Sequence, residues 1–118
     1  MNGYIKLDIG GKERGFKIGL YTLSETMKAL SIGIEQIQYA LENNPVEAVA
    51  LLMYNSAYFN ARLSGEVVDF TLINAYAWID EAGGLDSAPI VAFINTCIES
   101  FTKDVPEGKP LTEEQKKS

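Results

Sequence analysis

The hydrophobic pattern changes its period at Leu20, and this change constrains the fold more than any other feature of the sequence. Before it, apolar and polar residues alternate over residues 4–9 and again over 16–20, which predicts two half-buried strands. Gly10-Gly11 lies between them and can adopt the positive φ angles of a tight turn. We therefore predict an N-terminal β-hairpin, with Gly15 as a candidate bulge position.

After Leu20 the apolar residues recur at the spacing of three and four that is typical of helices. Thr22 followed by Glu25 fits a capping box, Asn44-Pro45 is a helix start, and Gly83-Gly84 is a helix terminator. The predicted helices run from Thr22 to about Leu30, from Ile34 to Asn43, from Pro45 to about Ser64, from about Thr71 to Glu81, and from Ala88 to Lys103.

These elements predict an α+β fold, mostly α, in which an N-terminal β-hairpin is followed by a compact bundle of about five helices. A single domain is expected over residues 1–103, because 47% of the residues are apolar and supply a sizeable core. Residues 104–118 are rich in proline, glycine and charge, which predicts a flexible polar C-terminal tail. We expect no signal peptide and no membrane span, since the apolar-rich stretch 46–63 is interrupted by polar residues.

Composition excludes several kinds of chemistry. The sequence has no histidine, so catalytic triads and metal sites built on imidazole are absent. Its one cysteine, Cys97, lies in register with Phe93 and Phe101 on an apolar stripe, where burial would raise its pKa and make it a poor nucleophile. A net charge of -6 argues against nucleic acid as a partner. We expect a protein that is not an enzyme, with no catalytic residue, cofactor or metal.

Charge is unevenly distributed along the chain. Residues 1–30 carry five basic and three acidic side chains, whereas residues 31–102 carry one basic and nine acidic ones. This polarity favours either head-to-tail self-association or a basic partner, and simple solubility is the alternative. An unpaired strand edge can also template another chain, so a homo-oligomer through the hairpin is predicted. The candidate self-association residues are Tyr4, Lys6, Lys12 and Arg14.

The predicted long helix, residues 45–64, has more aromatic and amide surface than a core helix needs. Tyr54, Tyr58 and Phe59 accompany the polar residues Asn55, Ser56 and Asn60. Tyrosine combines apolar area with a polar end, as is common at protein interfaces, although a stripe at helical spacing also fits a core. The candidate partner-binding residues are Tyr54, Tyr58, Phe59 and Trp78.

The order of short motifs carries a family resemblance. A Gly-Lys-Glu turn at residues 11–13 is followed by Phe16-Lys17-Ile18-Gly19-Leu20-Tyr21, which leads directly into a helix. An Asn-Pro helix start, a helix that closes on Ala82-Gly83-Gly84-Leu85, a final apolar helix and a polar tail ending in lysines come later. This order resembles the tail assembly chaperones of long-tailed bacteriophages and spans nearly the whole chain.

The resemblance implies a protein of the host cytoplasm, made in an infected or lysogenic bacterium and absent from the mature virion. Such chaperones bind the tape measure protein, keep it soluble and recruit tail tube subunits. Many also have a longer product made by ribosomal frameshifting, and adjacent codons for Lys116-Lys117 could form the A-rich slippery run. A gene without such a run would contradict this hypothesis.

Two alternatives remain open at the level of sequence. One is another small phage or prophage structural protein, such as a head-tail connector or a tail completion protein. The other is a metal-dependent hydrolase built from Asp69, Asp80 and Glu81. The second alternative requires these carboxylates to converge, and adjacent helical residues such as Asp80 and Glu81 point about 100° apart.

Overall fold

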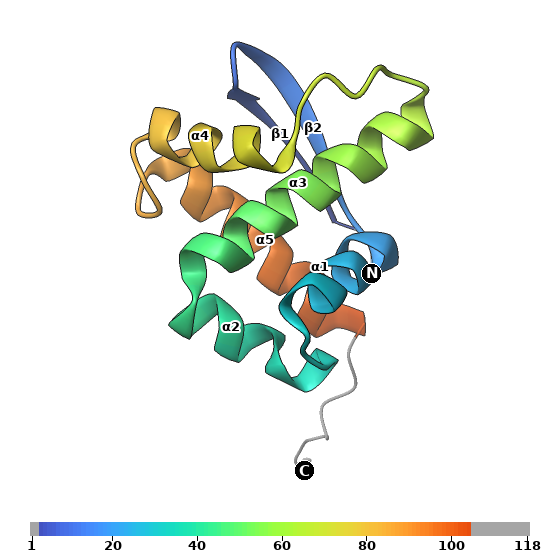
Figure 1. Ribbon diagram of the computed structural model, residues 1–118, viewed down its shortest axis with the longest axis vertical. Helices are drawn as coiled ribbons and strands as arrows, with labels where there is room; N and C mark the ends of the chain where they lie inside the picture. The colour runs from blue at the N-terminus through green and yellow to red at the C-terminus, as the bar shows by residue number, and fades with distance from the viewer. Residues whose placement is uncertain (1–2, 105–118) are drawn as a thin grey trace.

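An antiparallel hairpin opens the chain in the computed structural model, which describes residues 3–104 (Figure 1). Strands β1 (Gly3–Ile9) and β2 (Lys12–Ile18) pair in continuous register from Gly3 opposite Ile18 to Ile9 opposite Lys12. Gly10 and Gly11 form the turn with φ angles of 66° and 87°. The predicted hairpin is therefore confirmed.

The bulge considered at Gly15 is wrong, because the register passes through this residue without interruption and pairs it with Lys6. A different constraint selects glycine here. A Cβ atom on Gly15 would lie 2.5 Å from the Tyr4 hydroxyl oxygen and 2.7 Å from Asn60 Nδ2. The missing side chain thus leaves room for Tyr4 and Asn60 against the backbone of β2.

Five α-helices follow the hairpin among the described residues, so the predicted α+β, mostly α fold is confirmed. Their ends agree with the predicted signals: Gly65 and Gly83 terminate two of them in the left-handed conformation, and Pro45 opens the longest. The elements are α1 (Leu20–Leu30), a 3-10 turn η1 (Ile34–Gln36), α2 (Ile37–Asn43), α3 (Pro45–Ser64), α4 (Leu72–Ala82) and α5 (Ala88–Asp104).

The predicted cap of the first helix is wrong by one turn. Helix α1 begins at Leu20 with Gly19 as its N-cap, and Thr22 is the third helical residue. The Thr22 hydroxyl donates a hydrogen bond to the Lys17 carbonyl oxygen at 2.6 Å and accepts one from the Gly19 N–H at 3.4 Å. The end of β2 therefore supplies the acceptor for Thr22 and lets the helix start directly after the strand.

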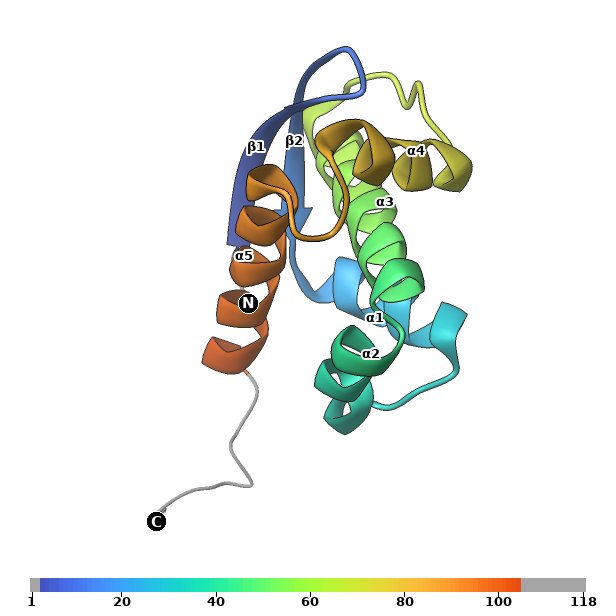
Figure 2. The same ribbon diagram turned by 90° about the vertical axis from the view of Figure 1, so that its left-hand side faces the viewer.

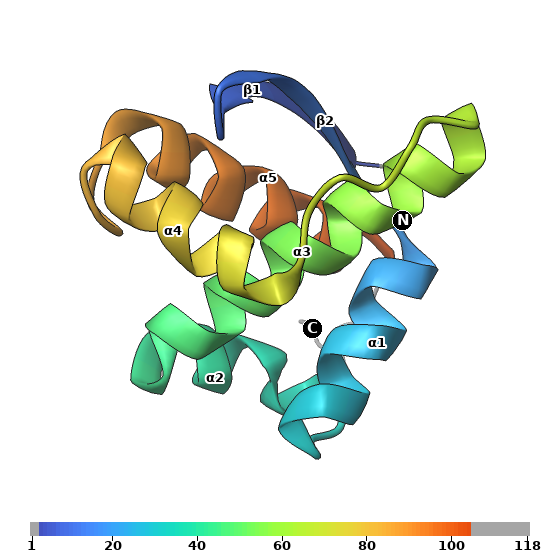
Figure 3. The same cartoon turned by 45° about the horizontal axis from the view of Figure 1, so that its top comes forward.

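Helix α3 is the central element of the fold. It crosses the molecule and contacts β2, α1, α2 and α4, as Figures 1 and 3 show. Helix α5 packs on the hairpin, mainly along β1, and also contacts α4 (Figure 2).

Phe16 on β2 sits where these elements meet, with its ring centroid 6.0 Å from that of Trp78 on α4 and 5.5 Å from that of Phe93 on α5. Cys97 is fully buried in this core, as predicted, and burial raises the pKa of its thiol.

The C-terminal part of the chain is described as far as Asp104, where α5 ends. The predicted tail, apart from that residue, lies outside the described part of the chain. Among residues 3–104, no helix combines the length and apolar character needed to cross a bilayer.

Candidate partner-binding surface

Aromatic rings from three segments form a continuous row on the surface. Tyr54 and Tyr58 lie one turn apart on α3, with ring centroids 6.1 Å apart. The Tyr21 ring on α1 lies 6.1 Å from that of Tyr58 and 5.2 Å from that of Phe59. Phe70, in the segment before α4, continues the row edge-on at 5.9 Å from Tyr54. We call these five residues the tyrosine face.

Local sequence explains why the rings meet. The spacing of four residues places Tyr54 and Tyr58 on one side of α3. Gly19 lies directly under Phe59, and a Cβ atom at this position would come 2.9 Å from the edge of the Phe59 ring. A side chain at the N-cap of α1 would therefore separate α1 from α3 and break the contact between Tyr21 and Phe59.

The tyrosine face is partly exposed, and two of its rings, Tyr54 and Phe70, also pack against the core. Tyr21 is 37% exposed, and the other four side chains are half-buried. Partial burial and the nearby Glu25 carboxylate both raise the pKa of Tyr21, and burial has the larger effect. The Arg62 guanidinium lies over the Tyr58 ring at 6.0 Å from its centroid. The face therefore combines apolar ring area with hydroxyl groups and a cation.

Two polar residues that the sequence suggested for this surface are instead buried. Asn55 is 7% exposed and donates a hydrogen bond of 3.0 Å to the Thr26 hydroxyl on α1. Ser56 is fully buried and bonds the Met53 carbonyl oxygen within α3. Asn55 therefore belongs to the contact between α1 and α3, while Asn60 is half-buried near Gly15.

Trp78 also differs from its predicted role. Its side chain is 3% exposed and packs between Phe16, Phe70 and the Arg14 guanidinium, whose carbon lies 4.8 Å from the indole ring. Trp78 is therefore a core residue, and its assignment as a partner-binding residue was wrong. It supports the surface indirectly, since it packs against Phe70 from beneath.

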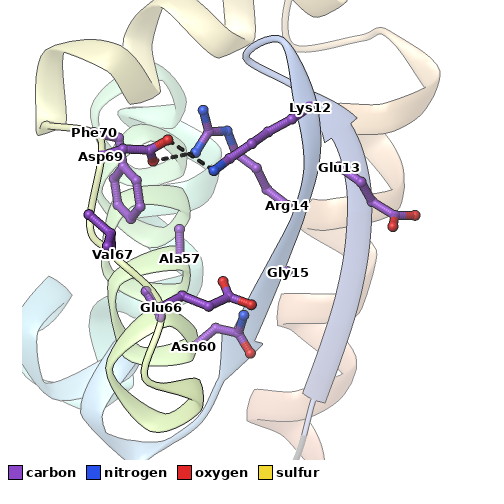
Figure 4. A pocket seen from close by; sticks show the side chains of 11 residues that line it. Lys12, Glu13, Arg14, Gly15, Ala57, Asn60, Glu66, Val67, Asp69 and Phe70 are labelled. Atoms are coloured by element: carbon purple, nitrogen blue, oxygen red, sulfur yellow. Dashed lines mark hydrogen bonds and ion pairs between the residues drawn. The ribbon is translucent and has the colours of Figure 1, made fainter.

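Lys12 and Arg14, predicted to mediate self-association, are held within the molecule by Asp69 (Figure 4). Arg14 Nη1 lies 2.9 Å from Asp69 Oδ1, and Lys12 Nζ lies 2.9 Å from Oδ2. Arg14 also donates to the carbonyl oxygens of Ile9 and Gly10 at 3.0 Å each. We call Lys12, Arg14 and Asp69 the Asp69 cluster; it joins the hairpin to the segment between α3 and α4.

The Asp69 cluster borders a cavity of about 250 Å³ between β2, α3 and residues 66–70. The hydrogen bonds from Lys12 and from Arg14 hold the pKa of Asp69 at about 2, well below its usual range. Both carboxylate oxygens are therefore already bound to cations.

In the part of the chain that the structure describes, no group of three or more Cys, Asp or Glu side chains is placed to hold a metal ion. Asp69, Asp80 and Glu81 do not form the site that the hydrolase alternative requires.

The remaining self-association candidates, Tyr4 and Lys6, lie on the outer side of the hairpin. Tyr4 is 49% exposed, and Lys6 Nζ lies 3.9 Å from Glu13 Oε1 across the strands.

Sequence reasoning missed Tyr21 and Phe70 as surface residues. The sequence carried one signal for Phe70. Arg14 shares the inward side of β2 with Phe16 and Ile18, and a cation in that position requires a carboxylate or an aromatic ring as its partner.

No family model, curated protein or solved structure matches this chain. Its surfaces must therefore be interpreted from their own chemistry. The tyrosine face offers rigid, amphipathic contact area of the kind that binds apolar side chains of another protein.

Proposed function

We propose that this protein is a tail assembly chaperone of a long-tailed bacteriophage. In this role it binds the tape measure protein, keeps it soluble and recruits tail tube subunits during tail assembly. The tyrosine face is the observation that carries the proposal. The motif order around Gly11-Lys12-Glu13 and Phe16 to Tyr21 supports the same role, and Tyr21 belongs to both the motif and the face.

The chemistry of the tyrosine face suits a long helical client. An amphipathic helix presents apolar side chains on one side at a spacing of three and four residues. Flat rings can contact such side chains with little loss of conformational entropy, and their hydroxyl groups keep the unoccupied face hydrated. The acidic charge of residues 31–102 further favours solubility of the complex.

The proposed place of action is the cytoplasm of the infected or lysogenic host, and the protein is absent from the finished particle. A homo-oligomer through the outer side of the hairpin, at Tyr4 and Lys6, remains part of the proposal. A structural protein such as a head-tail connector or tail completion protein is the alternative. Mass spectrometry of purified particles separates the two, because a connector stays in the virion.

The direct test is co-expression with the tape measure protein encoded downstream. We expect Tyr58→Ala to lower the soluble amount of the client several-fold, because it removes the central ring of the row. Tyr39→Ala is the matched control, since Tyr39 is 65% exposed on α2 and has no ring contact within the described residues. The proposal is wrong if the folded Tyr58→Ala variant solubilises the client as well as Tyr39→Ala does.

A further inference from the structure

A second exposed apolar surface lies where α2, the start of α3 and α4 meet. A cleft of about 360 Å³ is formed there by Asn43, Asn44, Pro45, Val46, Glu47 and Tyr76. Val46 is 50% exposed and Tyr76 is 36% exposed. Ile73, one turn before Tyr76 on α4, is 77% exposed and extends the apolar area along that helix. We call this the Tyr76 cleft; Figure 1 shows the start of α3 between α2 and α4.

The border of the Tyr76 cleft is acidic. Glu47 lines the cleft, and Asp80 lies one turn after Tyr76 on α4. Glu42 precedes Asn43 at the end of α2. Within residues 3–104, none of these three carboxylates makes an ion pair, and helices α2 and α4 contain no Lys or Arg. The cleft therefore presents negative charge around apolar area.

A second copy of the chain does not supply the complementary charge readily. The hairpin cations Lys12 and Arg14 are bound to Asp69, and Lys6 lies near Glu13. Lys28 is paired with Glu25 on α1. Self-association through Lys12, Arg14 or Lys28 would break contacts that the molecule already makes, whereas a separate basic helix can approach the cleft without that loss.

We propose that the Tyr76 cleft binds an amphipathic helix of another protein that has Lys or Arg beside its apolar face. Apolar side chains of this helix contact Val46, Ile73 and Tyr76, while its cations lie next to Glu47 and Asp80. Apolar contact provides the affinity, and the carboxylates select basic over acidic helices. The site is separate from the tyrosine face and does not depend on the proposed chaperone function.

The test measures binding of fluorescent model peptides to the full-length protein by anisotropy. Each peptide has about 18 residues, or five helical turns. The first has leucine on one face and lysine on the other, the second has glutamate in place of lysine, and the third has serine in place of leucine. We expect the leucine-lysine peptide to bind at least about tenfold more tightly than either of the others. Equal binding of the leucine-glutamate or the serine-lysine peptide overturns the proposal.

Variants then locate the bound peptide. Tyr76→Ala should weaken binding by about tenfold or more, and Glu47→Gln by about two- to fivefold. Glu99→Gln, which alters an exposed carboxylate of α5, should leave the affinity unchanged. The proposal fails if Glu99→Gln weakens binding as much as Glu47→Gln, or if Tyr58→Ala abolishes binding while Tyr76→Ala retains it.

Thermal unfolding of each variant checks that the fold is intact. If Tyr76→Ala does not fold, Ile73→Ser replaces it, because Ile73 is more exposed and contributes less to the core. Ile73→Ser should weaken binding at least about threefold without a change in stability, and unchanged binding by this folded variant contradicts the proposal.

Discussion

At the scale of single residues, Arg14 shows how a cation can occupy the inward side of a strand. Its side chain is only 10% exposed. Its guanidinium donates hydrogen bonds to two backbone carbonyls, pairs with the Asp69 carboxylate and lies over the rings of Phe70 and Trp78. A largely buried charge is tolerated when such partners replace water. The contact with Asp69 spans 55 residues of sequence, so no local pattern could predict it.

The low pKa of Asp69 makes the stability of the protein depend on pH. The pKa is about 2 in the folded state against an ordinary value near 3.8. The stabilisation is thus fully present above about pH 4 and is lost as the pH falls towards 2. We expect Asp69→Asn to lower the urea midpoint at pH 7 and the difference from the natural protein to disappear near pH 2. Asp86→Asn is the control, and an equal effect of both substitutions at pH 7 would contradict the assignment.

The two turn glycines should differ in their tolerance of alanine. Both have positive φ angles, which cost a non-glycine residue about 1–3 kcal/mol. A Cβ atom on Gly10 would also collide with the buried Trp78 indole, whereas nothing lies within 4 Å of a Cβ on Gly11. We expect Gly10→Ala to lower the free energy of unfolding by more than Gly11→Ala does in urea titrations. Equal losses would mean that Trp78 can move away.

At the scale of elements, a chain of side-chain hydrogen bonds joins three segments through the buried side of α1. Thr22 donates to the Lys17 carbonyl at the end of β2, and Thr26 donates to the Thr22 carbonyl at 2.8 Å. Asn55 on α3 then donates to the Thr26 hydroxyl at 3.0 Å. This chain aligns α1 between the hairpin and α3, and so places Tyr21 against Tyr58.

Removal of Asn55 tests this chain. Asn55→Ala should lower the free energy of unfolding by about 1–3 kcal/mol, because it removes the buried hydrogen bond to the Thr26 hydroxyl and opens a small cavity. Chemical denaturation measures the change, and Asn95→Ala, on the exposed side of α5, should stay within about 0.5 kcal/mol. In the double variant Asn55→Ala/Thr26→Val, the loss of unfolding free energy should be smaller than the sum of the losses in the two single variants. Full additivity would show that the hydrogen bond contributes nothing.

Element boundaries were largely predictable, whereas partners across elements were not. Asn44-Pro45, Gly65 and Gly83-Gly84 mark helix ends through local backbone chemistry, and the structure places the ends there. Asn55 and Trp78 look like surface residues in the sequence, but residues far away in the chain bury them. The tyrosine face was predicted in part for the same reason: Tyr54 and Tyr58 share one helix, whereas Tyr21 and Phe70 come from other segments.

At the scale of the whole molecule, Cys97 reports on opening of the core. It is fully buried, and the raised pKa of its thiol disfavours the reactive thiolate. We expect slow reaction with a thiol reagent in the native state, and faster labelling in Asn55→Ala by about 5- to 150-fold if global unfolding exposes the thiol. The Cys97→Ala variant, which has no thiol, measures the background signal of the reagent. Unchanged labelling in a destabilised Asn55→Ala variant would instead indicate that α5 opens separately from α3.

The position of Phe16 has a consequence for biosynthesis. The hairpin leaves the ribosome before α4 and α5, but the rings that cover Phe16 belong to Trp78 and Phe93 on those helices. At about 5–20 residues per second, these residues emerge about 3–15 s after it. During that interval Phe16 lacks these two rings, so its packing must wait for the last helix. A nascent chain of this protein therefore passes through a stage in which an apolar side chain of its later core is still exposed.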